Sequence, residues 1–212
     1  QRMQRKRLTV ADIRALKGKR QLTMMRVETM DELAAAEAAQ IDTVSVPPAM
    51  LADPRFRAVA PTVFAVPGLN FYEVGTTDDF IRWAFGMLKL GADAVYCSAS
   101  LDTVHALTRE HVPVIGHVGL VPSRATWTGG FRAVGKTAEQ AMMIWKQVQA
   151  YEEAGAFGAE IEVVPHEVAA EISRRTKLFM ISMGAGGGCD CQYLFATDVL
   201  GTNRGHIPRH AK

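Results

Sequence analysis

The chain has 212 residues, of which 48% are hydrophobic, and a formal net charge of +2. That length fits one domain, a little short of the roughly 250 residues usual for a (β/α)8 barrel. A net charge so near zero does not indicate a nucleic-acid partner. The basic opening segment 1–7 has no aromatic residues between its charges, so we interpret it as a solvated arm. No apolar stretch reaches the length of about 18 residues that a membrane span needs, and no signal peptide is visible. We therefore expect a soluble cytoplasmic protein that binds neither nucleic acid nor membrane.

The cysteine pattern favours the same location. The three cysteines, Cys97, Cys189 and Cys191, make an odd count without the spacing of a disulfide framework, so reduced thiols are expected. Only one residue separates Cys189 from Cys191, which is not the CxxC spacing of a zinc or redox site. We interpret these residues as ordinary loop or buried thiols.

Strand-like and helix-like patterns alternate through the chain. Strands are expected over 21–27, 41–46, 62–66, 94–97, 112–117, 159–164, 178–183 and 193–196. Helices are expected over about 29–39, 78–90, 101–110 and 137–155, the first and last opened by capping boxes, and a further helix can start at Pro165. The connection between Val46 and Thr62 is proline-rich, and we expect little regular structure in it.

This order predicts a (β/α)8 barrel of the TIM type, as a single domain over 1–212. Residues 1–20 would form an N-terminal arm and the first helix, and the last helix of the barrel is expected to be absent from this chain. A doubly wound open sheet is the alternative.

Two apolar tracts end in ionisable groups, at His117 and at Glu162. In such a barrel the functional groups lie at the carboxyl ends of the strands. Burial moves the pKa of a carboxyl group upward, which suits a base that removes a carbon-bound proton, so Glu162 is the candidate base. Its structural alternative is a carboxylate paired with an Arg or Lys. His117 could polarise a carbonyl or hold a carboxylate, or serve as a structural donor.

Other candidates lie at predicted strand ends: Ser45, Asn70, Ser98, Ser100 and the glycine run 184–188. The glycine run offers backbone N–H groups to an anion, or simply permits a tight turn. Asp42 and Glu160 come early in their strands, and we interpret them as stabilising or bottom-face groups. Carboxylates at neighbouring strand ends, which a hard cation would need, are not evident, and Glu73 is the nearest substitute.

The motif Gly116-His-Val-Gly-Leu-Val-Pro122 with Gly129-Gly-Phe131 resembles the fifth strand and following loop of the ketopantoate hydroxymethyltransferase family. Three more stretches agree in order and spacing: Glu162–Pro165, the Gly184–Gly186 loop with Asp190 and Gln192, and Gly205–Lys212. The resemblance extends from about Leu8 to the end. It implies a barrel of the phosphoenolpyruvate/pyruvate superfamily that assembles as a homo-oligomer, commonly a decamer, in the cytoplasm.

The resemblance also implies a reaction in pantothenate biosynthesis. The family's enzymes remove the C3 proton of 3-methyl-2-oxobutanoate and add the enolate to the one-carbon unit of methylenetetrahydrofolate, while magnesium chelates the small 2-oxo acid. The family's base falls on Glu162 and its strand-five histidine on His117. We predict Glu162 as the catalytic residue and His117, Ser45 and Ser98 as substrate-binding residues.

The chain departs from the family at the metal. The aspartates that ligate magnesium fall on Val46 and Val66, and the Lys and Glu of the fourth strand fall on Tyr96 and Ser98. No metal ligand is therefore predicted. Two alternatives to the family's reaction stay open. One is a metal-independent carbon–carbon lyase or transferase acting on another small oxo acid, with its oxyanion on His117, Ser98 or the glycine loop. The other is a non-catalytic paralogue that binds a metabolite or a partner.

Overall fold

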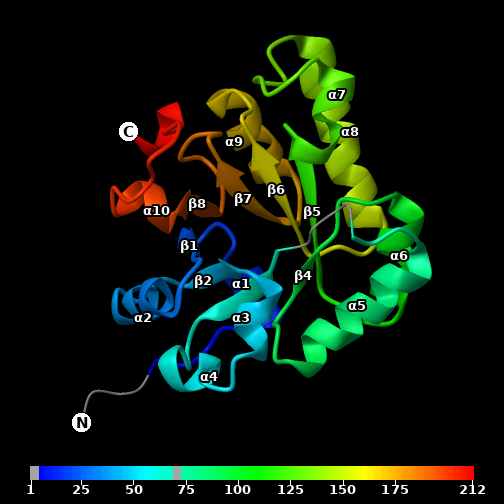
Figure 1. Ribbon diagram of the computed structural model, residues 1–212. Helices are drawn as coiled ribbons and strands as arrows, with labels where there is room; N and C mark the ends of the chain where they lie inside the picture. Colours follow the sequence, from blue (N-terminus) through cyan, green and yellow to red (C-terminus); the bar gives the residue numbers. More distant parts are fainter. Residues whose placement is uncertain (1–4, 69–72) are drawn as a thin grey trace.

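The computed structural model describes residues 5–68 and 73–212, and its centre is a sheet of eight parallel strands that curves into a nearly closed barrel (Figure 1). Neighbouring strands follow the order β3-β2-β1-β8-β7-β6-β5-β4. The strands are β1 (Leu22–Arg26), β2 (Thr43–Val46), β3 (Phe64–Pro67), β4 (Val95–Tyr96), β5 (Val114–Gly119), β6 (Gly158–Glu162), β7 (Phe179–Met183) and β8 (Cys191–Phe195). The predicted (β/α)8 barrel is confirmed, and the open doubly wound sheet is not.

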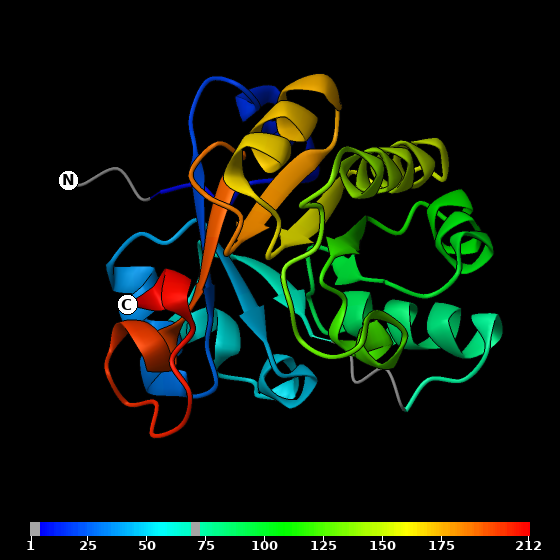
Figure 2. The ribbon, with the colours of Figure 1, turned by 90° about the horizontal axis from the view of Figure 1, so that it is seen from above.

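The helices surround the strands (Figure 2). They are α1 (Val10–Leu16), α2 (Met30–Ala38), α3 (Pro48–Ala52), α4 (Phe56–Val59), α5 (Thr77–Lys89), α6 (Leu101–Arg109), α7 (Ala125–Thr128), α8 (Ala138–Glu153), α9 (His166–Arg175) and α10 (Ala196–Val199), with 3-10 turns at Pro122–Arg124 and Arg209–Ala211. Thr29 and Thr137 cap α2 and α8 as their sequence patterns predict, each hydroxyl accepting a bond from a backbone N–H three residues on. In the part of the chain that the structure describes, no helix is both long and apolar enough to cross a membrane.

Two expectations about the connections are wrong. The proline-rich segment between β2 and β3 forms two short helices, α3 and α4, because Pro48 can occupy the first turn of a helix without losing a hydrogen bond. After β8 the chain does form a helix, α10, but it is only four residues long. The expected absence of a last helix is therefore corrected to the presence of a single turn.

The crossover from β7 to β8 has no helix, and the glycine run 184–188 makes it instead. This loop packs directly on α9: a Cβ atom at Gly186 would lie 2.4 Å from Cβ of His166, and one at Gly188 would lie 2.5 Å from Cβ of Ala170. Gly186 also has a φ of +84°, which side chains rarely adopt. The glycines serve close packing against a helix, so the structural interpretation of this run holds.

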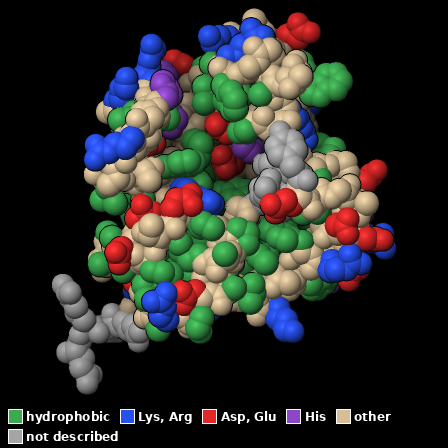
Figure 3. Space-filling model, in the orientation of Figure 1, with side chains coloured by type: hydrophobic (Ala, Val, Ile, Leu, Met, Phe, Trp, Pro, Cys, Tyr) green, Lys and Arg blue, Asp and Glu red, His purple; other side chains and the backbone are tan. Residues whose placement is uncertain are grey.

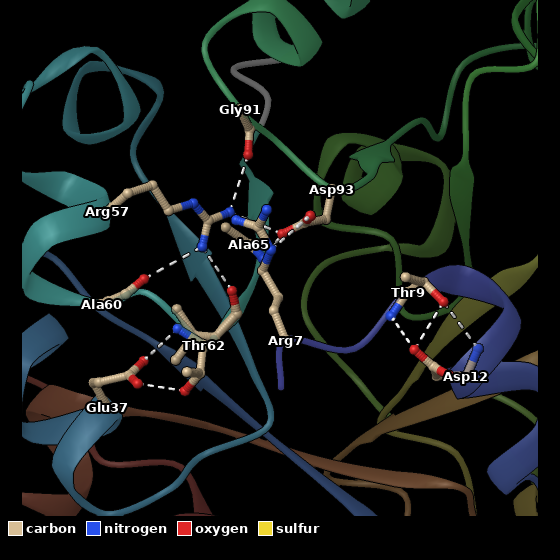
Figure 4. Close-up of polar contacts among 11 residues, drawn as sticks. Arg7, Thr9, Asp12, Glu37, Arg57, Ala60, Thr62, Ala65, Gly91 and Asp93 are labelled. Carbon is tan, nitrogen blue, oxygen red and sulfur yellow. Dashed lines mark hydrogen bonds and ion pairs between the residues drawn. The ribbon is translucent and has the colours of Figure 1, made fainter. Parts of the chain in front are cut away.

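The barrel closes between β3 and β4, which are not joined by a strand ladder, through Asp93 (Figure 4). Its backbone N–H donates to the carbonyl of Ala65 at 2.9 Å, and its Oδ2 accepts from the N–H of Ala65 at 2.8 Å. Arg57 of α4 donates to the same Oδ2 at 2.9 Å and to the carbonyls of Val63 and Gly91. The side chain of Arg7 approaches Asp93 Oδ1 at 3.7 Å. The backbone N–H and the carboxylate of Asp93 thus supply hydrogen bonds that a longer β4 would otherwise make.

The core has an inner and an outer layer because alternate residues of each strand face opposite sides. Inside the barrel lie side chains such as Met24, Phe64, Tyr96, Ile181 and Tyr193, and α1 packs against this cluster through Ile13. The outer layer, between strands and helices, contains the intervening strand residues such as Val44, Val46, Ala159 and Ile161. On β6 the inward positions are therefore 158, 160 and 162, and this places two glutamates inside one barrel wall.

Candidate active site

The candidate site is formed by the carboxyl-terminal halves of β5 and β6. In their parallel ladder His117 lies opposite Glu160, and Gly119 opposite Glu162. The three ionisable side chains therefore face the interior at two successive levels. In the space-filling view, acidic and histidine side chains gather in a hollow at the centre of the molecule (Figure 3).

His117 and Glu162 form a direct pair. The Nε2 atom of His117 lies 2.9 Å from Oε2 of Glu162 and 3.7 Å from Oε1 of Glu160. The side chains of His117 and Glu162 are only 11% and 13% exposed, so bulk water screens this contact weakly. The partner of Glu162 is an imidazole and not the guanidinium or ammonium of the structural alternative. An imidazole can give up its proton, so this pairing leaves the carboxylate chemically available.

The surroundings of His117 and of Glu160 raise the pKa of each group and so favour its protonated form. Burial alone would lower the pKa of His117, but the charge of Glu160 and the hydrogen bond to Glu162 outweigh it, so the pKa of His117 is raised above its usual value. Burial is the main cause that raises the pKa of Glu160, and the charge of Glu162 adds to it. Both shifts favour the protonated forms of the imidazole and of Glu160, next to the 2.9 Å contact between Nε2 of His117 and Glu162.

The site opens on a cavity of about 310 Å³. Its lining residues come from seven strands or the loops that follow them: Arg26, Glu28, Ser45, Gly68, Tyr96, Cys97, Ser98, Ile115, His117, Glu160, Tyr193 and Phe195. The cavity therefore includes three of the four predicted site residues, His117, Ser45 and Ser98, while Glu162 is bonded to one of them. A space of this size accommodates a small organic acid.

The two serines differ in their hydrogen bonding. Ser45 accepts a bond from Nη1 of Arg26 at 3.2 Å. Among the described residues, Ser98 Oγ is the one buried side-chain oxygen or nitrogen that has no hydrogen-bond partner. A buried hydroxyl without a partner costs free energy, so a ligand atom that bonds to Ser98 would remove that cost.

Two other predicted positions, Ser100 and Glu73, lie elsewhere. Ser100 caps α6, where its Oγ accepts from the N–H of Thr103. Glu73 is exposed and is not among the lining residues of the cavity, and Asn70 falls outside the residues that the structure describes. Asp42 is a stabilising group, as predicted, because it accepts from Arg20 and from the backbone and hydroxyl of Thr23.

The assignment of Glu160 to the bottom face is wrong. Glu160 is buried inside the barrel and lines the cavity beside His117. Its place along the strand suggested the opposite end, but the two-residue alternation of a strand puts it on the same side as Glu162. Two further lining residues, Arg26 and Tyr193, were also not predicted. The only signal for Arg26 was a charge in an otherwise apolar strand.

The positions that the family resemblance implies for magnesium do not fit a hard cation. Val66 is an aliphatic side chain of the barrel interior, and Val46 faces the outer layer, so neither can offer oxygen to the cavity. On that side the cavity is lined by Ser45, Gly68 and the guanidinium of Arg26, which repels cations. Across the cavity, His117, Glu160 and Glu162 offer three ligand atoms within 4.8 Å of one another, which is a possible ligand set for a first-row divalent ion.

A parallel eight-stranded barrel with a paired histidine and glutamate at adjacent strand ends, over a small cavity, has the architecture of a barrel enzyme that acts on a small acid. The family model described as ketopantoate hydroxymethyltransferase matches residues 31–212. The chain belongs to this family.

Similar proteins agree with that assignment. The chain is 33% identical to the 3-methyl-2-oxobutanoate hydroxymethyltransferase of Caldivirga maquilingensis, over 94% of this chain and 84% of the relative. It is 34% identical to the enzyme of that name from Thermus thermophilus, over 97% of this chain and 87% of the relative.

Solved structures show the fold. One is 2,3-dimethylmalate lyase, a member of the PEP mutase/isocitrate lyase superfamily, with a TM-score of 0.62, 15% identity and coverage of 92% of this chain and 83% of that chain. Another is a putative phosphonomutase from Burkholderia cenocepacia, with a TM-score of 0.68, 12% identity and coverage of 92% of this chain and 96% of that chain.

Proposed function

We propose that this protein is a one-carbon transferase that deprotonates C3 of a short 2-oxo acid, with 3-methyl-2-oxobutanoate as the expected substrate. The enolate then adds to the one-carbon unit of methylenetetrahydrofolate, the expected co-substrate. The observation that carries the proposal is the His117–Glu162 pair beside a cavity for a small acid, in a chain that belongs to the hydroxymethyltransferase family. Glu162 is the proposed general base.

The protein's own groups account for the proton transfer. The carboxylate of Glu162 takes the proton from C3, and the electron pair of that C–H bond moves to the C2 oxygen as an enolate. Hydrogen-bond donors at that oxygen stabilise the developing charge. The hydroxyl of Ser98, buried in the cavity and without a partner among the described residues, supports its role as one such donor. Over the whole reaction, the C3–H bond is replaced by C3–CH2OH, with carbon from the folate, oxygen from water and the proton ending on the released folate.

Exchange at C3 tests the base without the folate. In D2O, wild-type protein should replace the C3 proton of 3-methyl-2-oxobutanoate with deuterium, followed by proton NMR. Glu162→Gln keeps the shape and the bond to His117 but removes the base, so exchange should fall by roughly 10²- to 10⁴-fold. Glu167→Gln removes an exposed carboxylate bonded to a histidine and is the matched control, with no loss expected. Exchange that survives in Glu162→Gln would contradict the assignment of the base.

A second candidate function is a carbon–carbon lyase that uses the same enolate chemistry on another small oxo acid. The absence of carboxylates at the two implied magnesium positions favours a reaction unlike the family's. Product analysis separates the two functions. Hydroxymethylated product that forms only with methylenetetrahydrofolate supports the transferase. Cleavage of a branched oxo acid without folate supports the lyase. Neither exchange nor product with any short oxo acid would leave a non-catalytic protein.

A further inference from the structure

One wall of the cavity contains a fixed positive charge. We propose that Arg26 binds the carboxylate of the 2-oxo acid and takes the charge-neutralising role that the family resemblance assigns to a metal ion. This inference rests on the proposed function, because it names the residue that orients the proposed substrate. The supporting observations are the position of Arg26, the contacts that hold it and the charges around it.

Arg26 is the last residue of β1, at the carboxyl end where barrel sites lie. In the sheet it pairs with Ser45 on one side and with Phe195 on the other, and all three line the cavity. Its side chain is 20% exposed, so it is largely withdrawn from water yet open to the cavity. Among the lining residues that the structure describes, Arg26 is the only arginine or lysine.

Two contacts hold the guanidinium plane. The Nε–H donates to Oε1 of Glu28 at 2.7 Å, and Nη1 donates to Oγ of Ser45 at 3.2 Å. A guanidinium has five N–H donors in one plane, and these contacts use two of them. The plane is thus oriented before any ligand arrives, while further donors stay available for the two oxygens of a carboxylate.

Gly68 leaves the space that the guanidinium occupies. A Cβ atom at this position would lie 2.7 Å from Nη1 of Arg26, closer than non-bonded atoms approach. Any side chain at the end of β3 would therefore move the guanidinium from its place. The backbone at Gly68 and the side chain of Arg26 therefore pack closely against each other at the cavity wall.

The charges of the cavity are arranged in two groups. Arg26, with its partner Glu28, stands on the β1–β2 wall, and His117 with Glu160 on the β5–β6 wall. The free N–H donors of Arg26 attract the carboxylate of an anionic substrate, and the glutamates of the second group repel it. A short 2-oxo acid held at Arg26 by its carboxylate therefore points its carbon chain toward Glu162. Glu162 is the proposed base, and its carboxylate must reach the proton on C3.

The experiment compares an acid with its uncharged analogue. Binding of 3-methyl-2-oxobutanoate and of 3-methyl-2-oxobutanamide is measured by calorimetry in EDTA, for the wild type, Arg26→Gln, Arg26→Lys and Ser45→Ala. Wild type should bind the acid roughly 10- to 100-fold more tightly than the amide, as expected for a charged hydrogen bond. Arg26→Gln should bind both equally, and Arg26→Lys and Ser45→Ala should keep part of the preference. Arg82→Gln, which removes an exposed arginine of α5, is the matched control and should match the wild type.

Each of three results would overturn the inference. The first is a wild type without preference for the acid in EDTA, and the second is an Arg26→Gln protein that is folded by circular dichroism and keeps the preference. The third is binding of the acid that needs a divalent ion and is lost in Glu160→Gln, which would assign the charge to a cation at His117, Glu160 and Glu162. Failure of the proposed function has a different signature: the acid is bound through Arg26, but wild type shows neither C3 exchange nor product.

Discussion

The imidazole of His117 bonds to Glu162 through the same nitrogen that faces Glu160, at 2.9 Å and 3.7 Å respectively. A single ring nitrogen therefore connects an upper glutamate at the strand end with a lower glutamate buried inside the barrel. The protonation of His117, the partner of the proposed base, therefore depends on the buried carboxyl group of Glu160. This dependence leads directly to a prediction about pH.

We expect His117 to titrate above its ordinary pKa of 6.5, and Glu160→Gln to lower that titration point. The reason is that the charge of Glu160 is the largest of the effects that raise the pKa of His117 against burial. Proton–nitrogen NMR of the imidazole across a pH series measures this directly. Glu167→Gln is the control, and an unchanged titration of His117 in Glu160→Gln would contradict the coupling.

The raised pKa values of His117 and Glu160 also make stability depend on pH. The folded-state pKa values of His117 and Glu160 both lie above their ordinary values of 6.5 and 4.5, so the folded protein holds more protons than the unfolded chain. Their contribution to the free energy of unfolding is complete below the ordinary values and is lost as pH rises through the folded values. Denaturant midpoints should therefore fall from about pH 5 to pH 8 more steeply in wild type than in Glu160→Gln. A parallel dependence in both proteins would rule this out.

Removal of the Asp93 carboxylate, which joins β3 to the start of β4, should destabilise the barrel. Asp93→Ala leaves the N–H of Ala65 without its acceptor and Arg57 without its counter-ion, so we expect a loss of about 2–3 kcal/mol in urea unfolding. Glu171→Ala breaks ion pairs with Arg174 and Arg175 on the exposed side of α9 and should leave the midpoint nearly unchanged. Equal effects of the two substitutions would show that Asp93 does not close the barrel between β3 and β4.

The glycine loop offers a matched pair of substitutions. Gly186→Ala adds a Cβ atom 2.4 Å from Cβ of His166 at a φ of +84°, and should cost about 1–3 kcal/mol of stability. Gly187→Ala meets nothing within 4 Å and should be neutral or slightly stabilising. Thermal unfolding of both variants measures the difference. If Gly187→Ala were the more harmful of the two, the loop would not pack on α9 in this way.

The three cysteines should be unreactive in the folded protein. All three are buried, and burial raises the pKa of Cys97 and of Cys189 to about 11 and raises that of Cys191 well above its ordinary value. Thiolates are the reactive form, so Ellman's reagent at pH 8 should label none of them quickly, and all three after denaturation. Rapid labelling of one thiol without denaturant would place it at the surface.

Local patterns determined much of the architecture. Thr29 and Thr137 specify helix starts through their own side chains, and apolar runs such as 178–183 specify strands, because capping and period-two burial are properties of short segments. The places of His117 and Glu162 at carboxyl ends of parallel strands also followed, since such ends meet on one face, but their direct contact was not predicted.

Tertiary structure decided what short segments cannot encode. The place of Glu160 depends on which face of β6 turns inward, and that is set by the helices that cover Ala159 and Ile161. The place of Arg26 depends on Gly68 and Ser45, which come from two other strands and meet it only when the barrel closes. Closure itself depends on Asp93 and Arg57, which lie 36 residues apart. The chain alone therefore determined the elements and the proposed base, whereas the charges that surround the base arise from packing between distant strands.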